Sequence, residues 1–125
     1  MQMLKIENPQ EFRKKVQEKI NTVFQNPMFS FNLEKGIYNF SIHEAKRLKV
    51  VKKWTNHLFV VIYVNRFKSV FINLQHSNVL EQVQKGEILP HTLAFMTHQE
   101  WFPQKWEKMI QEKKNFWKVS AIKQK

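Results

Sequence analysis

The chain of 125 residues contains no cysteine, no aspartate and only two glycines. The absence of cysteine excludes disulfides, thiolate catalysis and cysteine-based zinc sites within these residues. The absence of aspartate excludes Ser-His-Asp triads and metal sites that depend on aspartate. Two isolated glycines cannot form a phosphate-cradling loop, and the five histidines lack metal-binding spacings such as HExxH. We therefore expect no catalytic residue, no metal site and no cofactor in this chain.

No apolar run reaches the roughly 18 residues that a membrane-spanning helix needs, so we expect no membrane partner. The charge, in contrast, is strongly one-sided. Lysine and arginine number 21 against 10 acids, all of them glutamates, and the formal net charge is +11. A small protein this basic is expected to meet nucleic acid, an anionic membrane or an acidic protein surface, although a solvated lysine-rich surface gives the same composition.

The apolar residues recur at the spacing of helices, beginning with a helix near the N-terminus. Asn8 has the position of a helix cap, Pro9 that of the first helical residue, and Glu11 follows three residues after the cap. Steps of three and four then place one apolar face on this helix. That face consists of Phe12, Val16, Ile20 and either Val23 or Phe24.

Two short helices are expected next, one starting at Ser30 or Asn32 and one running from Ser41 to about Leu48. Pro27 either ends the first helix or opens a loop, and Gly36 disfavours the interior of a helix. Ser41 and Glu44 have the spacing of a capping box, which predicts that a new helix starts there.

Residues 58–74 allow two interpretations from their pattern alone. Seven consecutive apolar residues rich in valine are typical of a buried strand, and a turn at Asn65 would make a hairpin. One long helix is favoured instead, because apolar residues keep steps of four, four, three and four without a turn signal. These residues are Phe59, Tyr63, Phe67, Val70 and Leu74.

Short helical segments are expected after the long one. Gly86 ends a helix capped at Ser77 or Asn78, Pro90 opens the next segment, and Thr97 with Glu100 forms a capping box. A further helix is expected through Trp117, and a frayed tail after it. The whole pattern predicts an all-α fold, a compact three-helix bundle with additional short helices.

A specific motif runs through residues 59–101. A tyrosine, a basic-serine pair and an Asn-Leu pair precede a spaced leucine and valine, then Gly-x-Ile-x-Pro, Leu-Ala-x-Met-Thr and a glutamate. In order and spacing this motif resembles the central domain of the transcription elongation factor TFIIS, and the resemblance extends over about residues 10–112. The matching residues are Tyr63, Lys68, Ser69, Asn73, Leu74, Leu80, Val83, Gly86, Ile88, Pro90, Leu93, Ala94, Met96, Thr97 and Glu100.

The resemblance implies that residues 56–74 form one helix and that the domain docks onto the jaw of the large subunit of a multisubunit DNA-directed RNA polymerase. In that family a separate C-terminal zinc ribbon carries an acidic Asp-Glu hairpin and stimulates cleavage of backtracked RNA. The ribbon is missing from this chain, which has neither cysteine nor aspartate. We expect a domain over residues 1–118, with residues 119–125 as the start of a linker and zinc only in the missing ribbon.

Docking is expected to use basic side chains on the second and third helices and the connection between them. Lys68 departs from the family pattern, which has arginine before the serine, and an ammonium lacks the bidentate geometry of a guanidinium. The seven candidate contact residues are Lys46, Arg47, Lys49, Lys52, Lys53, Arg66 and Lys68.

Two other functions remain open at this stage. The chain could be a basic helical domain that binds nucleic acid, or a TFIIS-like polymerase-binding domain of a chromatin or RNA-processing protein. The composition, rich in lysine, asparagine and phenylalanine, resembles versions of the factor from large DNA viruses. We expect a monomer that works in the nucleus, or in the host cytoplasm or the virion if the source is such a virus.

Overall fold

We describe residues 6–102 from a computed structural model of the chain. Within this range all regular secondary structure is helical and there is no strand, which confirms the predicted all-α bundle. It divides into two units, one ending at Phe95 and one beginning at Met96. The predicted helix through Trp117, the tail and the domain boundary at residue 118 lie outside the described range. The elements are α1 (Pro9–Phe24), α2 (Pro27–Leu48), α3 (His57–His76), α4 (Val79–Gln84), the 3₁₀ helix η1 (Pro90–Phe95) and α5 (His98–Trp101).

The first helix forms as its local signals predict. The backbone N–H of Glu11 donates to the Asn8 side chain at 3.1 Å, and Pro9 is the first residue of α1. Val16, Ile20 and Phe24 are buried along one face. The first N–H groups of a helix have no partner within the helix, and the Asn8 cap accepts a hydrogen bond from one of them. The apolar face packs against the rest of the bundle.

The second helix differs from the prediction, because residues 27–48 form one helix instead of two. The Asn26 side chain accepts from the backbone N–H of Phe29 at 3.1 Å, and Pro27 occupies the first helical position. Ser41 is not a cap: it is buried inside α2 and its hydroxyl donates to the Ile37 carbonyl at 2.8 Å. The start of α2 therefore repeats the Asn-Pro signal that begins α1.

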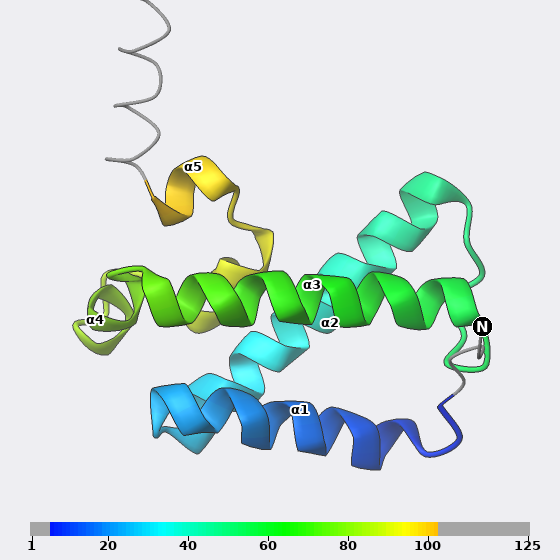
Figure 1. The fold of residues 1–125 in the computed structure, drawn as a ribbon, viewed down its shortest axis with the longest axis horizontal. Helices are drawn as coiled ribbons and strands as arrows, with labels where there is room; N and C mark the ends of the chain where they lie inside the picture. Colours follow the sequence, from blue (N-terminus) through cyan, green and yellow to red (C-terminus); the bar gives the residue numbers. More distant parts are fainter. Residues whose placement is uncertain (1–5, 103–125) are drawn as a thin grey trace, which may run out of the picture. The chain divides into compact units, whose positions relative to one another are not determined.

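The third helix confirms the helical interpretation of residues 58–74. It runs without interruption from His57 to His76, and the Asn56 side chain caps it by accepting from Leu58 N–H at 3.1 Å. α2 crosses behind α1 and α3 and makes the most extensive contacts of any element, with α1, α3 and η1 (Figure 1). The core of the first unit is apolar and contains Val16, Ile20, Phe24, Leu33, Ile37, Ala45, Phe59, Val60, Tyr63, Val70, Leu74, Val79, Val83, Leu93 and Ala94.

One carboxylate lies inside this apolar core and joins the three long helices. Glu34 of α2 is 0% exposed, and its oxygens accept from Arg13 Nε at 3.1 and 2.9 Å. The Gln17 side chain donates to it at 3.0 Å, and the Tyr63 hydroxyl donates at 2.9 Å. A buried charge is tolerated only when it is paired and hydrogen-bonded, as here. This network requires α1, α2 and α3 to pack in one register.

Burial and the nearby Glu34 charge raise the pKa of the Tyr63 hydroxyl, and its hydrogen bond to Glu34 acts in the same direction. Burial lowers the pKa of Arg13, but the hydrogen bond to Glu34 and the Glu34 charge outweigh it, so the pKa is raised overall. Tyr63 therefore remains a neutral donor and Arg13 remains a cation.

Gly36 lies in the middle of α2, where the sequence pattern disfavours it. A Cβ at this position would come within 2.4 Å of the backbone oxygen of His91 in η1. The absence of a side chain therefore lets η1 lie directly on α2. Tertiary contact, and no local preference, explains this glycine.

The shorter elements end and begin at the predicted signals. Gly86 has a φ of 79°, and its N–H donates to the Val83 carbonyl while Glu87 N–H donates to Gln82, which is the Schellman pattern. In the second unit, Thr97 N–H donates to the Glu100 side chain at 3.2 Å and Glu100 N–H donates to the Thr97 hydroxyl at 3.3 Å. The predicted capping box is confirmed.

Candidate docking surface

The candidate surface is set by an uneven distribution of charge along the chain. Between Glu44 and Glu81 the sequence contains no acidic residue and seven lysines or arginines, all of which were predicted as contact residues. Five of them lie at the C-terminal end of α2 or in the connection to α3, and each of these five is exposed. They are Lys46, Arg47, Lys49, Lys52 and Lys53, and we call them the basic corner.

Only one residue of the basic corner has an ion pair within the described chain. Arg47 Nε donates to Glu44 at 3.2 Å, and both guanidinium and carboxylate lie on the last turns of α2. This hydrogen bond lowers the pKa of Glu44, and the charge of Arg47 contributes in the same direction. Cations near the C-terminal end of a helix also interact favourably with its dipole. The corner therefore keeps a positive field in spite of its one neighbouring carboxylate.

The connection that carries Lys52 and Lys53 is held by hydrogen bonds. The Asn56 side chain donates to the Val51 carbonyl at 2.8 Å, and Asn56 N–H donates to the Lys53 carbonyl at 2.9 Å. Lys53 N–H in turn donates to Val51 at 3.0 Å. Because this backbone is already ordered, a partner would bind it at a lower cost in conformational entropy.

Trp54 anchors the same connection to the bundle. Its ring stacks on Tyr38 with centroids 6.0 Å apart and an interplanar angle of 11°. It also contacts Phe59 and Tyr63 of α3 edge-on, at 5.2 and 5.0 Å, and Phe12 of α1 at 6.0 Å. A single indole thus touches all three long helices, and the basic corner projects from a fixed position.

Arg66 plays a part that the sequence alone did not indicate. Its Nε donates to the Ala94 carbonyl in η1 at 2.7 Å, and its guanidinium carbon lies 4.0 Å from the centre of the Phe40 ring. Burial lowers its pKa, and the charge of Glu44 partly offsets that effect. Arg66 therefore ties α3 to η1 and α2, and it contributes to the fold as well as to the local charge.

Lys68 does not share a face with Arg66. Positions i and i+2 of an α-helix are separated by about 200° around its axis, so these two side chains point in nearly opposite directions. Lys68 is exposed, whereas Arg66 is half-buried against η1. Arg66 and Lys68 therefore do not form one basic face on α3.

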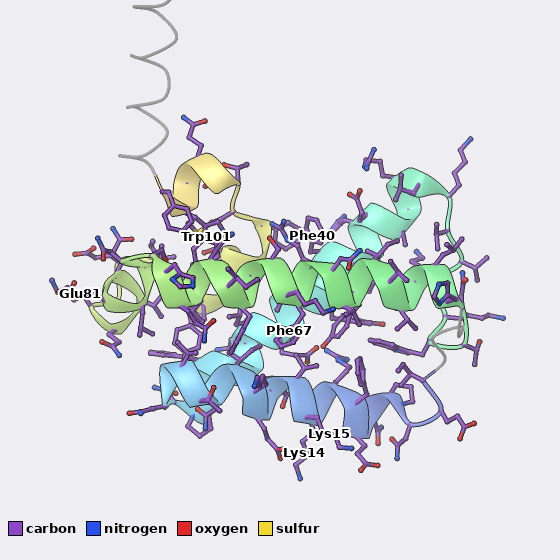
Figure 2. All side chains as sticks on the ribbon, viewed as in Figure 1. Lys14, Lys15, Phe40, Phe67, Glu81 and Trp101 are labelled. Carbon is purple, nitrogen blue, oxygen red and sulfur yellow. The ribbon has the colours of Figure 1, made fainter. Side chains whose placement is uncertain are left out.

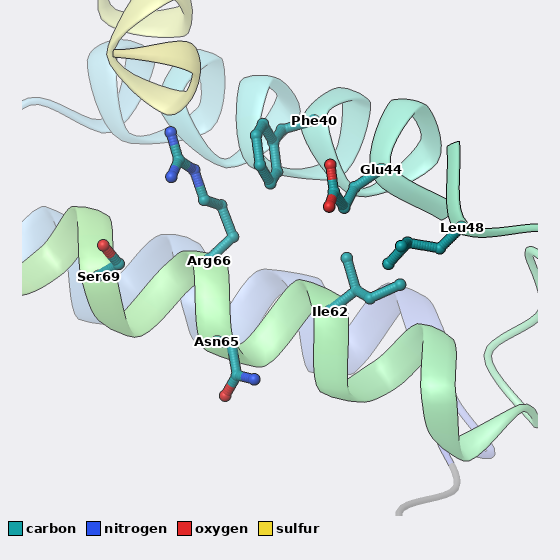
Figure 3. Close-up of a pocket in the computed structure, with 7 residues that line it drawn as sticks. All are labelled: Phe40, Glu44, Leu48, Ile62, Asn65, Arg66 and Ser69. Carbon is teal, nitrogen blue, oxygen red and sulfur yellow. The ribbon is translucent and has the colours of Figure 1, made fainter. Parts of the chain in front are cut away.

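A shallow hollow of about 260 Å³ lies between α2 and α3, next to the basic corner. Phe40, Glu44 and Leu48 point from α2 toward α3, and Ile62 and Arg66 point back from α3 (Figure 3). Asn65 and Ser69 complete its lining. Phe40, Leu48 and Ile62 thus give the hollow a mostly apolar lining, and Glu44 lies between Phe40 and Leu48 with Arg66 on one side.

Large apolar side chains stand exposed around the basic corner. Leu48, Val51 and Leu58 are 49%, 59% and 57% exposed, respectively. Leu48 and Val51 alternate with Lys49 and Lys52 in the segment LKVVKK, and Leu58 follows at the start of α3. From the sequence alone, only the charged residues of this segment were predicted as contacts. The apolar residues among them are also visible in the sequence. Their exposure, however, depends on how α2 meets α3.

Within the described residues, no three histidine or glutamate side chains lie close enough together to hold a metal ion. None of the helices in that same range is long and apolar enough to cross a membrane. Compared with protein-family models, with curated proteins and with solved structures, the chain has no significant match. Its function is therefore inferred from its own residues and their geometry.

Proposed function

We propose that this chain is a docking module that binds a multisubunit DNA-directed RNA polymerase, as the central domain of TFIIS does. The basic corner is the observation that carries the proposal. It belongs to a stretch of the chain with seven cations and no carboxylate, and Trp54 and Asn56 hold it in one conformation. Such a surface speeds the encounter with an acidic partner and fixes the orientation of binding.

The positions of the motif residues support the proposal at the level of the fold. Gly86 adopts the backbone conformation that glycine favours, Leu93 and Ala94 are fully buried, and Thr97 with Glu100 caps a helix. These residues shape the domain and do not line the basic corner. The motif therefore supports the proposal of a TFIIS-like domain, and the charges support the proposal that the basic corner makes the contact.

The proposed activity is docking alone. In the TFIIS family a zinc ribbon on a further segment stimulates RNA cleavage, and this module would position such a ribbon on the polymerase. Binding of nucleic acid is the competing function, because a stretch of cations without carboxylates also attracts phosphates.

The experiment measures binding of the chain to purified RNA polymerase after charge reversal at Lys52 and Lys53. Both side chains are exposed and make no ion pair in the described residues, so Lys52→Glu with Lys53→Glu should leave the fold intact. We expect binding to weaken by about 10-fold or more at moderate salt.

The matched control reverses Lys14 and Lys35 instead, which changes the net charge equally at exposed positions outside the basic corner. Lys14 lies on α1, away from the α2–α3 connection (Figure 2). Equal losses in the two double variants would contradict a localised docking surface. Tighter binding to duplex DNA or single-stranded RNA than to polymerase, with a steep salt dependence, would favour the nucleic-acid function.

A further inference from the structure

We propose that the groove between α2 and α3 receives an acidic amphipathic helix of a partner protein. This inference deepens the proposed function, on which it rests only in taking the partner to be a protein. It names the form of the partner at the basic corner: a helix with aliphatic anchors on one face and carboxylates beside them. The groove consists of the hollow between α2 and α3 together with Leu58, which lies one turn before Ile62 on α3.

The spacing of side chains along the groove fits a helix. Phe40, Glu44 and Leu48 recur every four residues along α2, and Leu58 and Ile62 recur in the same way on α3. Each row therefore presents one side chain per turn, which is the repeat of the ridges that helices pack into one another's grooves. A partner helix with anchors at i, i+4 and i+7 matches this repeat.

The size of the hollow favours side chains of a protein over a small molecule. Its volume of about 260 Å³ is below the roughly 300 to 1,000 Å³ of typical ligand pockets. It is open and most of its lining is apolar, with Phe40 opposite Arg66, and Ile62 opposite Leu48 and the paired Glu44 (Figure 3). Space of this kind accommodates one or two aliphatic side chains that project from a surface.

The charge around the groove selects an acidic occupant. Lys49 directly follows Leu48, Lys52 and Lys53 are exposed in the connection from α2 to α3, and the chain has no carboxylate between Glu44 and Glu81. Glu44 itself is paired with Arg47. Carboxylates that flank the aliphatic anchors of a partner would therefore meet cations, whereas a basic helix would be repelled.

The same observations disfavour the other occupants. A second copy of this chain would also carry a net charge of +11, so the two basic corners would repel each other. Leu48 and Leu58 offer no ring on which a nucleic-acid base could stack, and the Arg66 guanidinium already lies over one face of the Phe40 ring. Phe40 and Ile62 are only partly exposed between the two helices, so a flat bilayer would meet less of their surface than of Leu48 and Leu58.

The test uses a fluorescein-labelled peptide of about 18 residues, long enough to be helical, with leucines at i, i+4 and i+7 and glutamates around them. Fluorescence anisotropy with the full chain should show saturable binding. A peptide of equal charge with serine in place of leucine should bind about 10-fold more weakly, because it lacks the apolar anchors. In methyl NMR spectra, addition of the leucine peptide should shift the signals of Leu48, Leu58 and Ile62.

The protein variant Leu48→Ser with Leu58→Ser should weaken binding of the leucine peptide by about 10-fold or more. Leu89→Ser is the matched control, because Leu89 is 59% exposed yet lies far along the chain from the groove. It should leave binding unchanged, and thermal unfolding should show that all variants fold.

Three results would overturn the inference. These are failure of the leucine peptide to bind, equal binding of the serine peptide, and vesicles containing phosphatidylserine that bind through Leu48 and Leu58 while the peptide does not. If one of them occurs while polymerase binding still depends on Lys52 and Lys53, only the inference is lost. If the peptide binds as expected but charge reversal at Lys52 and Lys53 leaves polymerase binding unchanged, the inference stands and the proposed function is lost.

Discussion

Replacement of Arg13 by methionine tests whether the buried carboxylate network holds the three long helices together. Arg13→Met keeps an unbranched apolar side chain over Tyr38 and removes the guanidinium. Glu34 then keeps its hydrogen bonds from Gln17 and Tyr63 but loses the one ion pair that it makes within residues 6–102. The variant therefore leaves a negative charge in the core without a counter-charge.

The contacts of Glu34 bound the size of the effect. Removing one partner of a buried ion pair costs about 3 to 5 kcal/mol of folding free energy. Protonating an ordinary glutamate at pH 7 costs about 3.7 kcal/mol, so an unpaired charge cannot cost much more than that. The Arg13 side chain is 28% exposed, so water can approach the site and reduce the penalty. We expect a loss of about 3 kcal/mol in the free energy of unfolding at pH 7.

The assay is urea unfolding of the full chain, followed by far-UV circular dichroism and extrapolated to water. Lys14→Met is the matched control, because Lys14 is the exposed neighbour of Arg13 on α1, and its effect should stay within about 0.5 kcal/mol. In a Glu34→Gln background, Arg13→Met should cost only about 1 kcal/mol, which gives a coupling of about 2 kcal/mol. A single-variant loss below 1 kcal/mol, or a coupling near zero, would refute the proposed role of the network.

Three further predictions concern the backbone and the buried hydroxyl. Gly36→Ala should destabilise the protein by about 2 kcal/mol although alanine is the better helix former, because its Cβ would meet the His91 carbonyl. Urea unfolding measures this change, and a stabilised variant would contradict the close contact of α2 and η1. Lys49 ends α2 with a φ of 59°, so Lys49→Gly should stabilise by about 1 kcal/mol in the same assay, and a loss would show that the left-handed conformation carries no strain. Because the pKa of Tyr63 is raised in the folded state, the unfolded chain releases this proton first, and stability should decline above about pH 10. In Tyr63→Phe that decline should be smaller, and an unchanged pH profile would contradict the hydrogen-bonded burial of the hydroxyl.

Local signals were sufficient for most helix ends. The Asn-Pro start of α1, the glycine that ends α4 and the Thr97–Glu100 box depend on hydrogen bonds within five residues of chain. The start of α2 was predictable by the same rule, since Asn26 and Pro27 repeat the pattern of Asn8 and Pro9. The prediction failed there because the glycine and the apparent capping box inside the helix were given more weight than this start signal.

The candidate site was predictable only in part. The run of cations without carboxylates is visible in the sequence, and so are the apolar residues among them. Their exposure depends on where Trp54 fixes the α2–α3 connection, which no local pattern indicates. Arg66 shows the limit most clearly, because its hydrogen bond to Ala94 joins residues 28 positions apart.

The sequence by itself determined the all-α class, the ends of most helices and the excess of positive charge, because these depend on composition and on interactions between near neighbours. Only the tertiary structure decided why Gly36 must lack a side chain, why Glu34 can be buried, and which cations remain exposed. Each of these depends on groups from different helices meeting at distances of a few ångströms. Such contacts arise from packing of the whole bundle, and a linear pattern cannot encode which helix faces meet.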